Sequence, residues 1–80
     1  MAVYYFKLLG GFGDRSETSI SLDFDLSVAE VKEIVKKEFK VLPQLEIDFM
    51  VGGRKLPDDM KWGMTDVKPM KTNVLVIGHR

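Results

Sequence analysis

Residues 27–80 decide the fold, and they read SVAEVKEIVKKEFKVLPQLEIDFMVGGRKLPDDMKWGMTDVKPMKTNVLVIGHR. Ser27 and Glu30 have the spacing of a capping box, in which the serine hydroxyl and the glutamate carboxylate each accept a hydrogen bond from a free backbone N–H. A helix is therefore predicted to begin at Val28. Its apolar residues recur at the spacing of one buried stripe, Phe39 closes the core, and the pattern fades before Pro43.

The segments after this helix have the patterns of strands and turns. Residues 47–51 alternate, so the odd-numbered side chains are predicted to face a core while Met50 points outward. Residues 52–55, Gly-Gly-Arg-Lys, are predicted to form a turn. The apolar run 74–77 is too short for a helix and is typical of a strand covered on both faces, in the middle of a mixed sheet. Three residues between these strands are predicted to fill the core: Leu56, Trp62 and Val67.

The N-terminal third is predicted to form a hairpin. Residues 3–9 are rich in β-branched and aromatic side chains, and residues 19–25 alternate polar with apolar. In the second strand, Ile20, Leu22 and Phe24 are predicted to face the core. The glycine-rich segment 10–13 between them lacks the Gly-Lys-Ser/Thr ending of a phosphate loop and does not open a helix, so we interpret it as the hairpin loop.

The composition indicates one small globular domain spanning residues 1–80. Apolar residues make up 45% of the chain and charged residues 30%, which argues against disorder. Without cysteine there is no disulfide or thiolate zinc site, and a reducing compartment, the cytoplasm or the nucleus, is expected. The net charge is zero, the basic residues are not densely clustered, and no apolar run approaches a membrane span. We expect a soluble monomer that binds neither nucleic acid nor membrane.

The order hairpin, helix, strand, short strand and final strand resembles the β-grasp fold of ubiquitin. In this α+β fold one helix packs across one face of a mixed sheet of four to five strands. Residues 41–43, Val-Leu-Pro, resemble the proline-containing turn after the ubiquitin helix, and residues 49–56 resemble its third strand and following turn.

The last third of the chain is similar to a narrower group of ubiquitin-like domains. The residues that carry this likeness are the pairs Asp58-Asp59, Trp62-Gly63 and Val67-Lys68 and the closing run 74–78. They resemble the ubiquitin-like domains of BAG-type co-chaperones, proteasome-associated deubiquitinases and ubiquitin-like-domain phosphatases. The resemblance implies an unconjugated domain of a longer chain that docks through its open sheet face on the proteasome or on another ubiquitin-binding surface.

Alternation and position-matching to ubiquitin predict a small apolar patch on this open face. Exposed apolar patches on small proteins often mark partner sites. Because a shift of one residue inverts every side chain, the alternative is a slipped last strand in which Val74 and Val76 point outward. The predicted partner-binding residues are Leu9, Met50, Leu75 and Ile77, with Arg54 and His79 at the rim.

The leading functional hypothesis is a non-covalent interaction module that recruits a longer protein to the proteasome or to a ubiquitin receptor. The alternative is a covalent modifier or sulfur carrier whose Gly-Gly end would follow Arg80, because basic residues commonly precede that end in the family. A third hypothesis is a structural scaffold outside the ubiquitin pathway. A modifier would use exposed lysines as linkage sites, and the candidates are Lys32, Lys36, Lys37, Lys55 and Lys68.

Catalysis finds little support in the sequence. A nucleophile needs a base to activate it, and the chain has one histidine, His79, near its end and no cysteine. Asp23 and Asp25 share a predicted strand face, but two carboxylates without further oxygen ligands make a poor calcium site. We therefore predict no enzymatic activity, no cofactor and no metal site.

Overall fold

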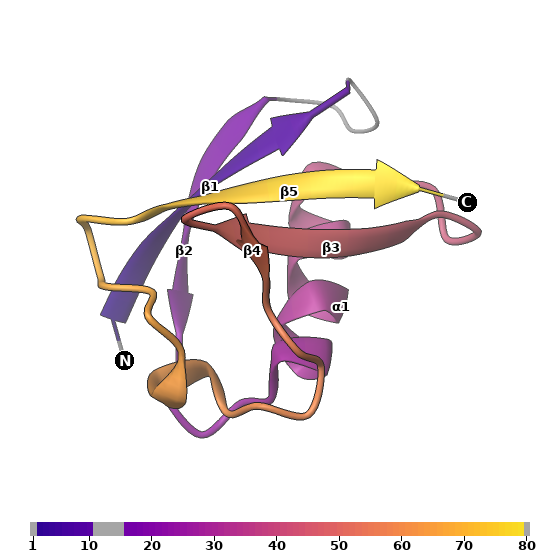
Figure 1. Ribbon diagram of the computed structural model, residues 1–80. Helices are drawn as coiled ribbons and strands as arrows, with labels where there is room; N and C mark the ends of the chain where they lie inside the picture. Colours follow the sequence, from indigo (N-terminus) through magenta and orange to yellow (C-terminus); the bar gives the residue numbers. More distant parts are fainter. Residues whose placement is uncertain (1, 11–15, 80) are drawn as a thin grey trace.

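The computed structural model describes residues 2–10 and 16–79. All five described strands form one mixed sheet in the order β2-β1-β5-β3-β4, in which the central β5 runs parallel to β1 and antiparallel to β3. The single described α-helix, α1, lies across one face of this sheet (Figure 1). The predicted α+β β-grasp architecture is therefore confirmed. The elements are β1 (Ala2–Leu9), β2 (Glu17–Leu22), α1 (Val28–Phe39), β3 (Glu46–Val51), β4 (Arg54–Lys55), the 3-10 turn η1 (Trp62–Met64) and β5 (Asn73–His79).

The start and end of α1 follow from its capping residues. Ser27 Oγ accepts a hydrogen bond from the Glu30 N–H at 3.2 Å, and Glu30 Oε1 accepts one from the Ser27 N–H at 3.1 Å, as the capping box predicts. At the other end Lys40 has a left-handed φ of 55°, which ends the helix before the proline turn. Val28, Val31 and Val35 of the predicted stripe are fully buried, as is Phe39, whereas Ile34 is half-buried against the core.

The core lies between α1 and the sheet, and aromatic rings form its centre. Tyr4, Phe6, Phe49 and Trp62 pack together with ring centroids 5.4 to 5.9 Å apart. Trp62 is fully buried, as predicted, because the short turn η1 inserts it between the strands and the start of α1. These contacts join β1, β3 and η1 on the side of the sheet that α1 covers, and the opposite face of the sheet carries none of these rings.

One prediction about the core is wrong, and two others are met only in part. Phe24 is 49% exposed, because β2 ends at Leu22 and the Asp23 carboxylate accepts a hydrogen bond from the Asp25 N–H at 3.2 Å. That local turn breaks the alternation on which the prediction rested. Val51, the last residue of β3, and Leu56, just after β4, pack against the core but are only half-buried.

The N-terminal third forms the predicted hairpin. The hairpin of β1 and β2 is observed, with the Leu8 N–H donating to the Ser16 carbonyl at 2.7 Å. The predicted loop 10–13 lies outside the described residues except for Gly10. Within the described part of the chain, no helix has the length and apolar character needed to cross a membrane.

Candidate functional site

The face of the sheet opposite α1 carries the predicted apolar patch. Strand pairing places Leu9 beside Ile77 and Met50 beside Leu75, and directly paired residues have their side chains on the same face. Val74 and Val76, which alternate with Leu75 and Ile77 along β5, are both fully buried. The last strand therefore has the register on which the patch was predicted, and not the slipped one.

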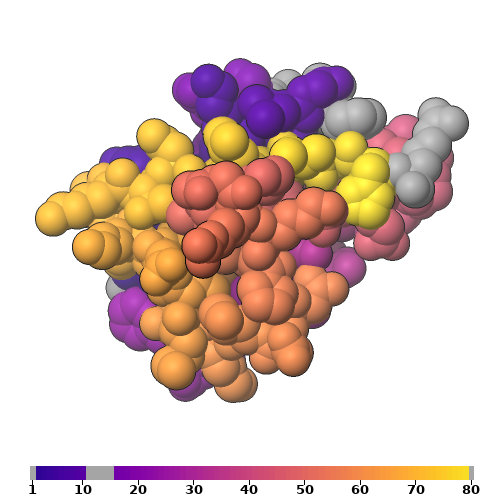
Figure 2. Space-filling model, in the orientation of Figure 1, coloured from indigo at the N-terminus to yellow at the C-terminus, as the bar shows by residue number. Residues whose placement is uncertain are grey.

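The apolar patch, defined as Leu9, Met50, Leu75 and Ile77, is accessible to a partner. Leu9 is 38% exposed, and the other three side chains are half-buried against their neighbours. Figure 2 shows this side of the molecule, with β5 in yellow between β1 in indigo and the β3–β4 hairpin in red-orange. A role of the patch in binding stays a prediction.

Arg54 does not lie at the rim of the apolar patch, where it was predicted. Both residues of the Gly-Gly turn have positive φ angles, 59° and 79°, the geometry of a tight two-residue hairpin turn. This turn pairs Val51 with Arg54 and Met50 with Lys55. Arg54 therefore shares the side of the sheet that α1 covers, and Lys55 takes the rim position beside Met50.

Asp48 organises the basic rim of the patch. It pairs with Ile77 across β3 and β5, so it lies on the open face. Its Oδ2 lies 2.9 Å from Nε2 of His79 and 3.6 Å from Nζ of Lys55. The rim thus consists of two basic side chains held by one carboxylate, and His79 lies where it was predicted.

Lys32 of α1 also forms an ion pair with the Asp48 carboxylate, which it reaches from the helix side of the sheet. Its Nζ lies 3.3 Å from Oδ1 of Asp48 and also pairs with Asp58 in the loop after β4. The Lys32 side chain is only 14% exposed, so the prediction of an exposed modification site at Lys32 is wrong. Its aliphatic stem is covered, and its amine is held by two carboxylates.

These contacts shift both pKa values in the direction of an ion pair. Burial acts to lower the pKa of Lys32, but the carboxylates of Asp58 and Asp48 outweigh it and hold that pKa above its ordinary value. Burial likewise acts to raise the pKa of Asp48, while Lys32, His79 and Lys55 together hold it below its ordinary value. Both groups are therefore charged at neutral pH.

The other candidate lysines differ in their access to solvent. Lys36 is half-buried and donates to the carbonyl of Pro43 at 3.2 Å, which ties the last turn of α1 to the proline turn. Lys37, Lys55 and Lys68 are exposed. Of the five predicted linkage sites, these three are accessible without breaking a contact of α1.

Among the described residues, those considered for metal binding or catalysis are engaged in local or pairwise contacts and form no metal-binding cluster. In residues 2–10 and 16–79, no three His, Asp or Glu side chains come together as a metal site would require. Asp23 and Asp25, the pair considered for a cation, form the local turn after β2. His79 is engaged with Asp48.

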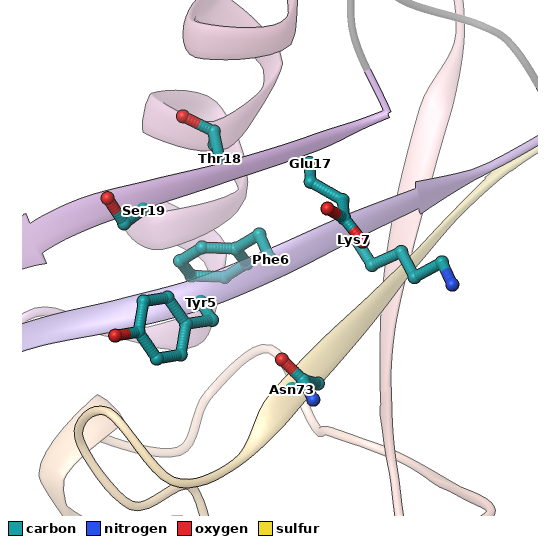
Figure 3. A pocket seen from close by; sticks show the side chains of 7 residues that line it. All are labelled: Tyr5, Phe6, Lys7, Glu17, Thr18, Ser19 and Asn73. Carbon is teal, nitrogen blue, oxygen red and sulfur yellow. The ribbon is translucent and has the colours of Figure 1, made fainter.

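A shallow hollow borders the apolar patch and was not predicted. It has a volume of about 260 Å³ and is lined mainly by Tyr5, Lys7, Glu17, Ser19 and Asn73 of β1, β2 and β5. Figure 3 shows these side chains. Alternation placed Tyr5 and Lys7 on one face, but no local pattern indicates that β5 brings Asn73 beside Tyr5.

Comparison with known proteins identifies the fold of the chain but not its family or its partner. No protein-family model matches the sequence, and no curated protein matches it. Among solved structures, one similar to this chain is a computationally designed protein based on the template of human erythrocytic ubiquitin. It has a TM-score of 0.76 and 14% identity over 100% of this chain and 94% of that one.

A second solved structure, described as a molecular mimic of SUMO that promotes DNA repair, is also similar. It has a TM-score of 0.69 and 14% identity over 100% of this chain and 94% of that one. Both likenesses cover the whole chain, and both neighbours are ubiquitin-like. The chain therefore has a ubiquitin-like β-grasp fold.

Proposed function

We propose that this chain is a non-covalent protein-protein interaction module of the ubiquitin–proteasome system that docks through its open sheet face. The observation that carries this proposal is the apolar patch itself. Four apolar side chains from three strands converge on the one sheet face that α1 does not cover. Methionine at its centre suits a docking surface, because its flexible thioether adapts to varied partners.

The chemistry of the rim supports a partner with acidic residues beside its apolar contacts. Lys55 is exposed, and its tether to Asp48 holds it next to Met50. His79 lies at the same end of the patch. A partner carboxylate placed there would gain orientation and association rate from the Lys55 charge and could accept a hydrogen bond from the His79 ring, while the apolar contacts supply most of the affinity.

The identity of the partner class rests on the resemblance of residues 58–78 to ubiquitin-like domains of larger proteins. We propose a proteasome subunit or a ubiquitin receptor as the partner, the cytoplasm or nucleus as the site of action, and recruitment of an attached chain, with no catalysis by this domain. The fold supports protein-protein interaction in general, and the narrower partner is the part that experiment must test.

The test is a pair of matched substitutions. Met50→Asp places a charge in the apolar patch, whereas Met64→Asp makes the same change in η1, outside the sheet, where Met64 is 76% exposed. Binding of each purified variant to purified proteasome and to a ubiquitin receptor is measured by surface plasmon resonance. We expect Met50→Asp to weaken binding at least about tenfold, as for a central interface residue, and Met64→Asp to leave it unchanged.

Two outcomes contradict the proposal. Equal binding by the wild type and Met50→Asp would place the interface elsewhere, and absence of binding by the wild type would remove the proposed partner class. The NMR spectrum of Met50→Asp checks that the variant is folded. The covalent-modifier alternative predicts instead a ladder of heavier adducts in the intact mass of the endogenous protein, captured with an antibody to this domain.

A further inference from the structure

The hollow beside the apolar patch has the size of a pocket for one side chain. Its volume of about 260 Å³ lies below the range of about 300 to 1,000 Å³ that small-molecule sites occupy. Lys7 lines the hollow and pairs directly with Leu75 of the apolar patch. A partner docked on the patch would therefore bring its neighbouring side chains over this hollow.

The lining residues present acceptors and an aromatic ring. Tyr5 pairs with Ser19 on one side and with Asn73 on the other, so a hydroxyl and an amide flank its ring. Tyr5 is 36% exposed. Glu17 adds a carboxylate from β2. Ser, Asn and Glu side chains all offer oxygen acceptors to a ligand.

The two charged residues of the hollow are not equivalent. Figure 3 shows the amino nitrogen of Lys7 directed away from Tyr5 and Asn73. Lys7 pairs with Glu17 across β1 and β2, but its amine points out of the hollow, so the nearer charge for a ligand beside Tyr5 and Asn73 is the Glu17 carboxylate. A carboxylate ligand would be repelled by Glu17, and a cationic ligand would be attracted.

We propose that this hollow binds the guanidinium group of an arginine of the docked partner. A planar guanidinium can stack on the Tyr5 ring, pair with the Glu17 carboxylate and donate to the side-chain oxygens of Ser19 and Asn73. Arginine suits the site better than lysine because its delocalised cation stacks on rings and donates in a fixed fork. This inference rests on the proposed function, because the arginine belongs to a protein docked on the apolar patch.

The experiment uses a probe that needs no identified partner. The ¹⁵N-labelled protein is titrated at constant ionic strength with N-acetyl-arginine methylamide, and in parallel with the neutral citrulline analogue. We expect saturable shifts of the Tyr5, Ser19 and Asn73 amides with the arginine probe alone. Glu17→Gln should weaken this binding about two- to fivefold, as for an ion pair at a solvent-exposed site. Asp25→Asn, an exposed acid outside the hollow, is the control and should have no effect.

Equal shifts with the citrulline probe, or arginine shifts spread over Asp25 and other exposed acids, would overturn the inference. So would unchanged arginine binding in Glu17→Gln. These results are independent of the partner assay with Met50→Asp, because Met50 does not line the hollow. Loss of partner binding in Met50→Asp without any arginine binding in the hollow would keep the proposed function and remove only the arginine subsite.

Discussion

Replacing Lys32 with methionine should destabilise the fold, although substitution of a lysine on the surface of a helix usually changes stability little. Methionine keeps much of the covered aliphatic stem but removes the amine that pairs with Asp48 and Asp58. The Lys32 side chain is 14% exposed and that of Asp48 is 21% exposed, whereas Asp58 is 64% exposed. Most of the effect should therefore come through Asp48.

The expected magnitude lies between two limits. Fully exposed ion pairs contribute about 0.2–1 kcal/mol, and removing one partner of a buried pair costs about 3–5 kcal/mol. Asp48 keeps His79 and Lys55 after the change, which reduces the cost of leaving its carboxylate half-buried. We expect Lys32→Met to lower the free energy of unfolding by about 1–2 kcal/mol, between the exposed and buried limits.

The dependence on pH identifies the cause. The pKa of Asp48 is lowered by folding from its ordinary value of 3.8, so its contribution is complete above that value and is lost as the pH falls through the folded pKa. The pKa of Lys32 is raised from 10.5, so its contribution is complete below that value and is lost as the pH rises further. The difference between wild type and Lys32→Met should be present at neutral pH and shrink as the pH falls through the folded pKa of Asp48.

Urea denaturation of a double-mutant cycle provides the measurement. We expect Lys32→Met and Asp48→Asn to couple by about 1 kcal/mol, within the range for residues in one ion-pair network. The control Lys37→Met removes an exposed amine from the same helix and should stay within about 0.5 kcal/mol of the wild type. A coupling energy near zero, or an equal loss of stability at acid and neutral pH, would refute the reasoning.

Two further predictions concern local backbone geometry. Ser27→Ala removes the capping box at α1 and should lower the free energy of unfolding by about 1 kcal/mol in thermal denaturation, whereas the exposed Ser21→Ala should change it little. Gly53→Ala should cost about 1–2 kcal/mol, because φ is 79° there while the added methyl group meets nothing within 4 Å. Its urea midpoint checks this value, and faster exchange of the Leu56 amide, which donates to Phe49 at 3.0 Å, would place the loss in the β3–β4 hairpin.

The fold could be predicted because local signals agree along most of the chain. The capping box at Ser27 fixes the start of α1, and the stripe to Phe39 fixes its buried face. Alternation in residues 47–51 and the apolar run 74–77 indicate the two strands that carry most of the apolar patch. Each of these signals depends on neighbours a few residues away, so it survives without knowledge of the tertiary structure.

The errors occur where a side chain responds to residues distant in the sequence or to an exact turn. Phe24 was placed in the core by alternation, but a hydrogen bond of Asp23 ends the strand two residues earlier. Lys32 belongs to the polar face of α1 and was therefore expected to be exposed, because no local pattern shows that Asp48 lies within its reach. Arg54 was misplaced because the face of a residue after a turn depends on the number of turn residues.

The Gly-Gly turn also places Lys55 beside Met50, and this placement bears on the orientation in which a partner would bind the proposed docking face. One row of paired residues crosses the sheet from Glu17 of β2 through Lys7, Leu75 and Met50 to Lys55 of β4. One end carries the Glu17 carboxylate beside Lys7, the other end carries the Lys55 amine, and Leu75 and Met50 between them are apolar. A partner that matched only the apolar centre could bind in either direction along the row, whereas a partner with an arginine over Glu17 and a carboxylate by Lys55 can bind in one. Affinity on this face would then come from its centre, and orientation from its two ends.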